Sequence, residues 1–186
     1  MDIKFILHKV LPPRTFEGRD GFDNREFVSH LSNDDKELLE NKLIERLNDI
    51  PANDKIDELI IETLAFLKSK KSIELIRSRI NEHQSDFSNL IITVSLYNLT
   101  NEPELIDVAL NYFKRIENST NSYVRGQLNY MFHYLSMLQS DQANSFILKY
   151  TKSEDKNLRY NAFRALNPQA SLNDLKRIIN NKKENT

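Results

Sequence analysis

Cysteine and tryptophan are absent from this chain of 186 residues, and glycine and proline are scarce, at 3 and 5 residues. Without cysteine the chain forms no disulfide and offers no thiolate to a metal or a substrate. Sheet-rich folds need many turns, which favour glycine and proline. Their scarcity predicts long helices joined by short polar loops. The lack of cysteine also fits a reducing cytoplasm.

A charge excess of one sign and a long apolar run are also missing. The net charge is -1, whereas dedicated nucleic-acid binders carry a basic excess that neutralises phosphates. No run approaches the roughly 20 apolar residues of a membrane span. The start of the chain, Met1 to Lys9, is too short and too polar for a secretory signal. Hydrophobic residues at 39% and charged residues at 28% predict a globular cytoplasmic protein without a membrane partner.

The chain divides into three parts by pattern. Residues 1–25 are the least regular, because Pro12 and Pro13 end a short apolar segment that forms either a helix or a strand. The charged stretch 14–25 reads either as a functional loop or as a mobile tail. A single helical domain is expected over residues 26–180. Residues 181–186 are polar, and we expect them to be frayed.

Local helix signals begin at residue 26. The apolar residues of 27–31 predict a short helix that stops near Ser32. Ser32 or Asn33 is then expected to cap a longer helix, with Asp34 and Asp35 in its first turn, where carboxylates favour the positive end of the helix dipole. The leucines and isoleucine of 38–47 follow a helical period, and Pro51 closes this helix.

An internal repeat is the strongest signal in the sequence. The apolar positions of one unit recur 32 and 99 residues later, and a further copy lies at offsets of 68 to 70. The four sets are Leu64, Leu67, Ile73, Ile76, Ile80; Leu96, Leu99, Leu105, Val108, Tyr112; Phe132, Leu135, Ala143, Phe146, Tyr150; and Phe163, Leu166, Leu172, Leu175, Ile179.

Each repeat contains two helical stretches separated by a short polar joint. Helices with joints this short must lie antiparallel. One such pair cannot bury its own apolar face, so consecutive pairs are expected to stack and share a core. The predicted fold class is all-α, with about four stacked antiparallel helix pairs.

The stretch from Leu158 to Asn167, LRYNAFRALN, resembles the inner helix of a HEAT repeat, and Glu62–Ile80 and Thr93–Tyr112 are similar with a weaker consensus. The resemblance implies a right-handed α-α superhelix over roughly residues 55–180. It also implies that Arg159 stacks or pairs with an acidic residue of a neighbouring helix. The other units carry Ile60, Ile92 and Leu128 at the position of Arg159, so those copies are degenerate.

Alignment of the repeats places a row of polar and aromatic side chains along one face of the first helices. By the resemblance, this face would be concave. Large side chains with a hydrogen-bonding group suit contact surfaces. The alternative is that the tyrosines only fill the flank of the core, with their hydroxyls in water. The candidate binding residues are Tyr97, Asn129, Tyr130, His133, Tyr160, Asn161 and Arg164.

Residue patterns for catalysis or metal binding are missing. The four histidines form no HxxxH or HExxH pair, and His83 and Glu82, as neighbours in a helix, would not face each other. The acidic pairs lie at expected helix starts or in loops, which is typical of solvated caps. We therefore predict no catalytic residue, no metal and no cofactor.

The leading hypothesis is a non-enzymatic protein-binding module, because solenoids present extended surfaces and near-neutral charge suits a protein partner. Its small, bacterial-looking form would suit an adaptor or an inhibitor, such as the immunity partner of a toxin.

Two other functions stay open. Certain alkylpurine DNA glycosylases are similar to HEAT-like stacks, and a basic face built from Arg77, Arg79, Lys114, Arg115, Arg125 and Lys149 would favour DNA. Some lyases also resemble such stacks, and Tyr130 and His133 lie one turn apart, where they could line a ligand pocket.

Overall fold

The structure, a computed structural model, describes residues 1–11, 24–52, 56–171 and 173–174. These residues fold into helices, and the described part of the chain contains no strand. The predicted all-α class is therefore confirmed. The elements in chain order are α1 (Ile3–Val10), α2 (Arg25–Ser29), α3 (Asn33–Asp49), α4 (Asp57–Phe66), η1 (Lys70–Ser72), α5 (Ile73–Arg79), α6 (Asp86–Thr100), α7 (Glu104–Glu117), α8 (Ser122–Gly126), α9 (Leu128–Met137), α10 (Asp141–Tyr150) and α11 (Lys156–Leu166).

The chain divides into two compact units. Unit 1 comprises Met1–Gln84 and Ile91–Asn101, and unit 2 comprises Ser85–Leu90 and Glu102–Thr186. The first residues of α6 therefore belong to unit 2 and the rest to unit 1. The single domain expected over 26–180 and the superhelical stacking of its pairs stay predictions, and the expected tail at 181–186 lies outside the described residues.

Unit 1 begins with a helix, which decides between the two possibilities for the first apolar segment. Asp2 caps α1 by accepting a hydrogen bond from the backbone N–H of Lys4. Ile6 and Val10, one turn apart, are fully buried, and α1 packs against α3. The segment 1–25 is therefore helical at its start, because these two apolar side chains are buried in unit 1. The charged stretch 14–25 lies outside the described residues up to residue 23.

The next two helices follow the local signals in the sequence. Helix α2 is short, and Ser32 caps α3 by accepting a hydrogen bond from the N–H of Asp35. Leu39, Leu43 and Leu47 are fully buried along one face of α3. Leu38 is 40% exposed, so the core face is narrower than the apolar pattern suggests.

The repeated apolar positions face inward, as predicted. Each described member of the four sets is buried or half-buried, including Leu64, Leu96, Phe132 and Leu135. The three members Leu172, Leu175 and Ile179 lie outside the described residues. A period that is read from the sequence therefore identifies core positions within both units.

The ends of four helices show the same backbone conformation. Left-handed residues lie one or two positions after α4, α5, α6 and α9, namely Lys68 (φ 58°), Asn81 (φ 71°), Asn101 (φ 56°) and Gln139 (φ 47°). Glycine usually occupies such positions because it carries no Cβ. In this glycine-poor chain larger residues take its place, so a search for glycine would not find these helix ends.

The core of unit 2 is aromatic. The ring of Phe113 on α7 lies 6.3 Å from that of Phe132 on α9, 5.8 Å from that of Phe146 and 6.2 Å from that of Tyr150, both on α10. The hydroxyl of Tyr150 donates a 2.6 Å hydrogen bond to the carboxylate of Glu117. Burial raises the pKa of Tyr150, and the bond to Glu117 raises it further. The hydroxyl therefore keeps its proton and holds α10 to α7.

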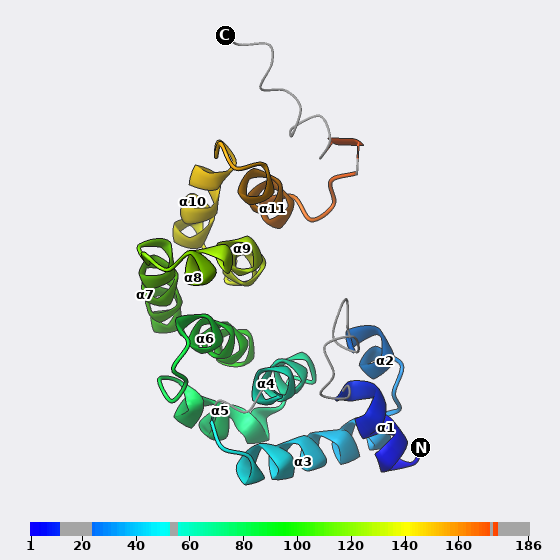
Figure 1. Cartoon of the computed structure of the whole chain (residues 1–186). Helices are drawn as coiled ribbons and strands as arrows, with labels where there is room; N and C mark the ends of the chain where they lie inside the picture. Colours follow the sequence, from blue (N-terminus) through cyan, green and yellow to red (C-terminus); the bar gives the residue numbers. More distant parts are fainter. Residues whose placement is uncertain (12–23, 53–55, 172, 175–186) are drawn as a thin grey trace. The chain divides into compact units, whose positions relative to one another are not determined.

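Helices α9, α10 and α11 pack against one another within unit 2 (Figure 1). Only Leu138, Gln139 and Ser140 separate α9 from α10, and five residues separate α10 from α11. Joints this short reverse the chain direction each time, so α9 and α11 run parallel.

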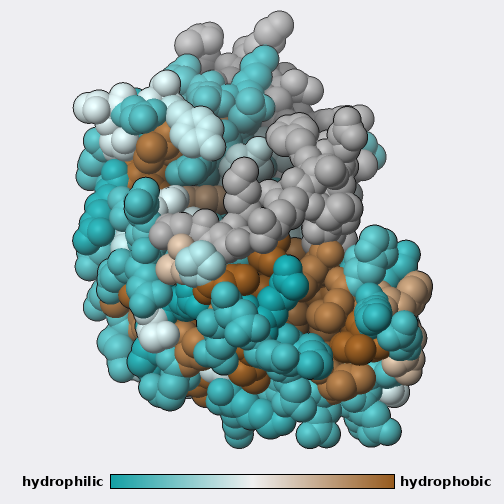
Figure 2. Space-filling view, turned by 60° about the horizontal axis from the view of Figure 1, so that its bottom comes forward, coloured by the Kyte–Doolittle hydropathy of each residue, from teal (hydrophilic) through white to brown (hydrophobic). Residues whose placement is uncertain are grey.

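The described helices include none with the length and apolar character needed to cross a membrane. Some large apolar side chains reach the surface, such as Phe5 at 46% and Leu148 at 58% exposure. Figure 2 shows one face of the molecule, on which hydrophilic residues predominate and apolar residues lie among them.

Candidate functional site

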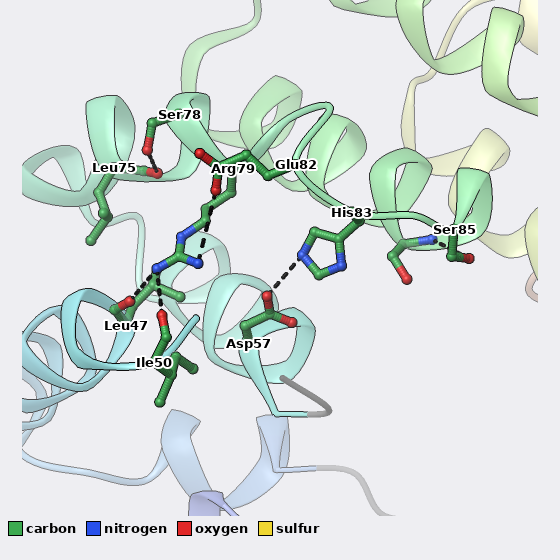
Figure 3. A network of polar contacts seen from close by, with 10 residues as sticks. Leu47, Ile50, Asp57, Leu75, Ser78, Arg79, Glu82, His83 and Ser85 are labelled. Carbon is green, nitrogen blue, oxygen red and sulfur yellow. Dashed lines mark hydrogen bonds and ion pairs between the residues drawn. The ribbon is translucent and has the colours of Figure 1, made fainter. Parts of the chain in front are cut away.

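A buried pair of ionisable side chains lies in unit 1 (Figure 3). The Nε2 atom of His83, in the segment after α5, is 2.8 Å from Oδ2 of Asp57 in the first turn of α4. The side chains are 3% and 0% exposed. Asp57 also lies at the positive end of its helix dipole, which favours a carboxylate there. The pair therefore joins the start of α4 to a segment 26 residues later in the chain.

The pKa of the Asp57 carboxyl is raised by burial, and the nearby His83 and Arg79 oppose part of this rise. A perturbed acid beside a histidine is a combination that many catalytic sites use. Catalysis also requires that the acid reach a substrate, and both side chains of this pair are almost completely enclosed. The geometry therefore fits a structural pair of buried side chains.

Glu58 joins this pair to form a possible ligand set. One ligand atom each from Asp57, Glu58 and His83 lies within 4.8 Å of the others, and Glu58 is half-buried. Two carboxylates and an imidazole are donors that a zinc ion accepts. Two of these three donors contact each other directly, at 2.8 Å, and Oδ1 of Asp57 is buried without a hydrogen-bond partner among the described residues.

Arg79, at the end of α5, closes the end of α3 (Figure 3). Its guanidinium donates to the carbonyl oxygens of Leu47, at 2.6 Å, and Ile50, at 2.9 Å. Carbonyls at a helix C-terminus have no partner inside the helix, and a cation there also favours the helix dipole. Arg79 is 7% exposed, so it stabilises unit 1 and presents little charge to a partner.

The second candidate region is the surface of α9 and α11 in unit 2. The Nδ2 atom of Asn161 on α11 donates a 3.2 Å hydrogen bond to Oδ1 of Asn129 on α9. This contact brings together two residues that the repeat alignment places on one face. We refer to Asn129, Tyr130, His133, Tyr160, Asn161 and Arg164 as the α9–α11 face.

Large side chains project from this face. Tyr130 is 68% exposed, His133 and Arg164 are exposed, and Tyr160 is half-buried. His133 follows Asn129 by one helical turn, and Arg164 follows Asn161 by one turn. Because α9 and α11 run parallel, both side chains lie on the same side of the Asn129–Asn161 hydrogen bond. The face therefore combines two aromatic rings, an imidazole and a guanidinium.

The remaining candidate, Tyr97, is not part of the α9–α11 face. It lies on α6 in unit 1 and is half-buried, whereas the other six candidates lie in unit 2.

Arg159 is buried and donates a 2.5 Å hydrogen bond to the Ser153 carbonyl. The HEAT resemblance implies a partner for this side chain on a neighbouring helix. Arg159 holds the segment between α10 and α11.

The sequence pattern missed the Asp57–His83 pair. Motif spacing compares residues within one helix, and His83 meets a side chain that comes from another segment of unit 1. A buried histidine is not distinguishable from an exposed one by composition.

Comparison of the chain with models of protein families, with curated proteins and with solved structures finds no match. Function is therefore inferred from geometry.

Proposed function

We propose that this chain is a non-enzymatic, HEAT-like protein-binding module, an adaptor or inhibitor, that contacts its partner through the α9–α11 face. The hydrogen bond between Asn129 and Asn161 carries this proposal, because it fixes two helix faces side by side as one surface. Tyr130, His133 and Arg164 project from that surface. Tyrosine and arginine are enriched among residues that dominate binding energy.

The packing beneath the face supports its role as a preformed surface. Met131, Phe132 and Leu135 are fully buried on the opposite side of α9, and Ala162 is fully buried on α11. Side chains on rigid helices lose less freedom on binding than side chains on loops. A partner would therefore meet a surface that is already ordered.

Several cations of the alternative DNA-binding set are already engaged. Arg79 binds the carbonyls of α3, and Arg115 lies 3.2 Å from Asp86. Lys149 lies 4.0 Å from Glu117 and 4.5 Å from the ring centre of Phe146. These contacts, together with the near-zero net charge, favour a protein partner over DNA.

The test compares retention of proteins from a lysate of the source organism by two immobilised baits. One is the unchanged protein and the other carries Tyr130→Ala, His133→Ala and Arg164→Ala. We expect the unchanged protein to retain a partner specifically. The affinity of that purified partner should fall by at least about tenfold for the triple variant, since each change removes a side chain of the type that anchors interfaces.

The control bait carries three exposed substitutions on α7 and α10, Asn111→Ala, Leu148→Ala and Lys149→Ala. It should retain the partner as the unchanged protein does, with circular dichroism showing that all baits are helical. Equal retention by both triple variants, or no specific retention by the unchanged protein, would contradict the proposal.

A further inference from the structure

Negative charge is missing from the two helices that form the α9–α11 face and from α8, which precedes α9 in the chain. Helices α8, α9 and α11 contain no aspartate or glutamate, and they contain the basic residues Arg125, Lys156, Arg159 and Arg164. The other helices of unit 2 differ. Helix α7 contains Glu104, Asp107 and Glu117, and α10 contains Asp141. Charge is therefore sorted between the two sets of helices in unit 2.

The cations of the two sets also differ in their surroundings. On α7 and α10, Arg115 pairs with Asp86, Lys149 lies within 4.0 Å of Glu117, and Lys114 lies 5.3 Å from the ring centre of Phe146. On α8 and α11, Arg125, Lys156 and Arg164 are exposed, and the described residues provide no ion pair for any of the three. Arg125 lies close enough to Tyr150 of α10 for its charge to lower the pKa of that hydroxyl, whereas Arg164 belongs to the α9–α11 face and is available to a molecule outside the chain.

We infer that the α9–α11 face binds an acidic segment of a partner protein, with Arg164 as the main contact for a carboxylate. This inference rests on the proposed function and specifies the partner's chemistry. A guanidinium presents two parallel N–H groups that match the two oxygens of a carboxylate. No carboxylate on α9 or α11 competes for Arg164.

The arrangement favours a carboxylate-bearing protein over a nucleic acid. Tight nucleic-acid binders neutralise roughly 6–10 phosphates, whereas α8, α9 and α11 together carry three exposed cations, Arg125, Lys156 and Arg164. Arg159 adds none, since it is 5% exposed and donates to the Ser153 carbonyl. Tyr130, His133 and Tyr160 add rings that pack against the apolar parts of a peptide.

The inference can be tested with peptide arrays that carry one set of 15-residue scaffolds in three forms. The forms carry Asp and Glu, Asn and Gln, or Lys and Arg at the same positions. A single-stranded DNA oligonucleotide forms the fourth probe. We expect the unchanged protein to bind acidic peptides and to bind them more weakly as salt increases. Arg164→Gln should weaken this binding at least about tenfold, and Arg164→Glu should abolish it.

Lys149→Gln and Lys149→Glu are the matched controls, because they make the same charge changes on α10, where the lysine lies beside Glu117 of α7. They should leave peptide binding unchanged. Preference for the neutral or basic peptides, or binding to none of the peptides, would overturn the acidic-segment inference, and the lysate experiment would still decide the proposed function. Stronger binding to the oligonucleotide than to any peptide would overturn both.

Discussion

The two units of this chain differ in the side chains that lie buried between their helices. In unit 1, buried polar side chains cross between elements: Asn24 donates to the Val10 carbonyl and to Thr63, His83 meets Asp57, and Arg79 closes α3. In unit 2, aromatic rings fill the space between α7, α9 and α10, and the Tyr150 hydroxyl adds a hydrogen bond to Glu117. The same helical repeat is therefore compatible with two kinds of core.

This difference teaches how each core should respond to substitution. Aromatic packing depends on volume, so removal of a ring leaves a cavity. A buried polar contact depends on its partner, so removal of one member leaves the other without compensation.

Phe113→Ala should be the most damaging change. Phe113 is fully buried and contacts three other rings, and a buried phenylalanine replaced by alanine costs about 3–5 kcal/mol. Urea unfolding followed by circular dichroism measures the loss. Tyr123→Ala, at a side chain that is 79% exposed, is the control and should change the free energy of unfolding by less than about 0.5 kcal/mol. Similar losses for the two variants would show that the cluster is not the core of unit 2.

His83→Ala should lower the free energy of unfolding by about 3 kcal/mol, because Asp57 would stay buried without its partner. His8→Ala, at an exposed position on α1, serves as the control. In a double-mutant cycle, Asp57→Asn combined with His83→Ala should cost less than the sum of the two single changes. Additive losses would mean that the two side chains do not interact.

Arg79→Met should lower the free energy of unfolding by about 2 kcal/mol. The change keeps most of the side-chain volume and leaves the carbonyls of Leu47 and Ile50 without their donor. Arg77→Met is the matched control, since Arg77 is on the same helix, is 38% exposed and contacts Glu74. Hydrogen exchange should show faster exchange at the end of α3 only in the first variant. Equal protection in both would remove the capping role of Arg79.

The raised pKa of Asp57 predicts a dependence of stability on pH. Between the ordinary value of 3.8 and the higher value in the fold, the unfolded chain loses the proton and the folded chain keeps it. The free energy of unfolding of the unchanged protein, relative to Asp57→Asn, should therefore fall as the pH rises through this window. Each unit of pKa difference corresponds to about 1.4 kcal/mol. Unfolding measured from pH 3 upward tests this sign, and a relative stability that increases with pH would refute it.

Much of the fold follows from periodicity in the sequence. The apolar positions of the repeat, such as Leu64 and Phe132, are buried because a helix places residues three and four apart on one face. Ser32 caps α3 because its hydroxyl reaches an N–H three residues ahead. Both rules act over a few neighbouring residues, so they can be applied to the amino-acid sequence alone.

Some properties of the α9–α11 face follow from the local sequence pattern, and others depend on tertiary packing. Alignment of the repeats selected Asn129 and Asn161 for one row, and the structure joins them by a hydrogen bond. Their exposure depends on what packs against each helix, which is why Tyr130 is 68% exposed and Tyr160 is half-buried. The repeat alignment also placed Tyr97 in this row, and it belongs to the other unit.

The sequence by itself determined the helical class, the positions of the core residues and the helix caps, since these depend on neighbours within a few turns. Only the tertiary structure decided which buried polar groups meet. Asp57 and His83, or Arg79 and the end of α3, come from segments far apart in the chain, and their energies depend on distance and on exclusion of water. Neither the distance nor the exclusion of water can be deduced from the spacing of residues in the sequence, because both are set when the helices pack.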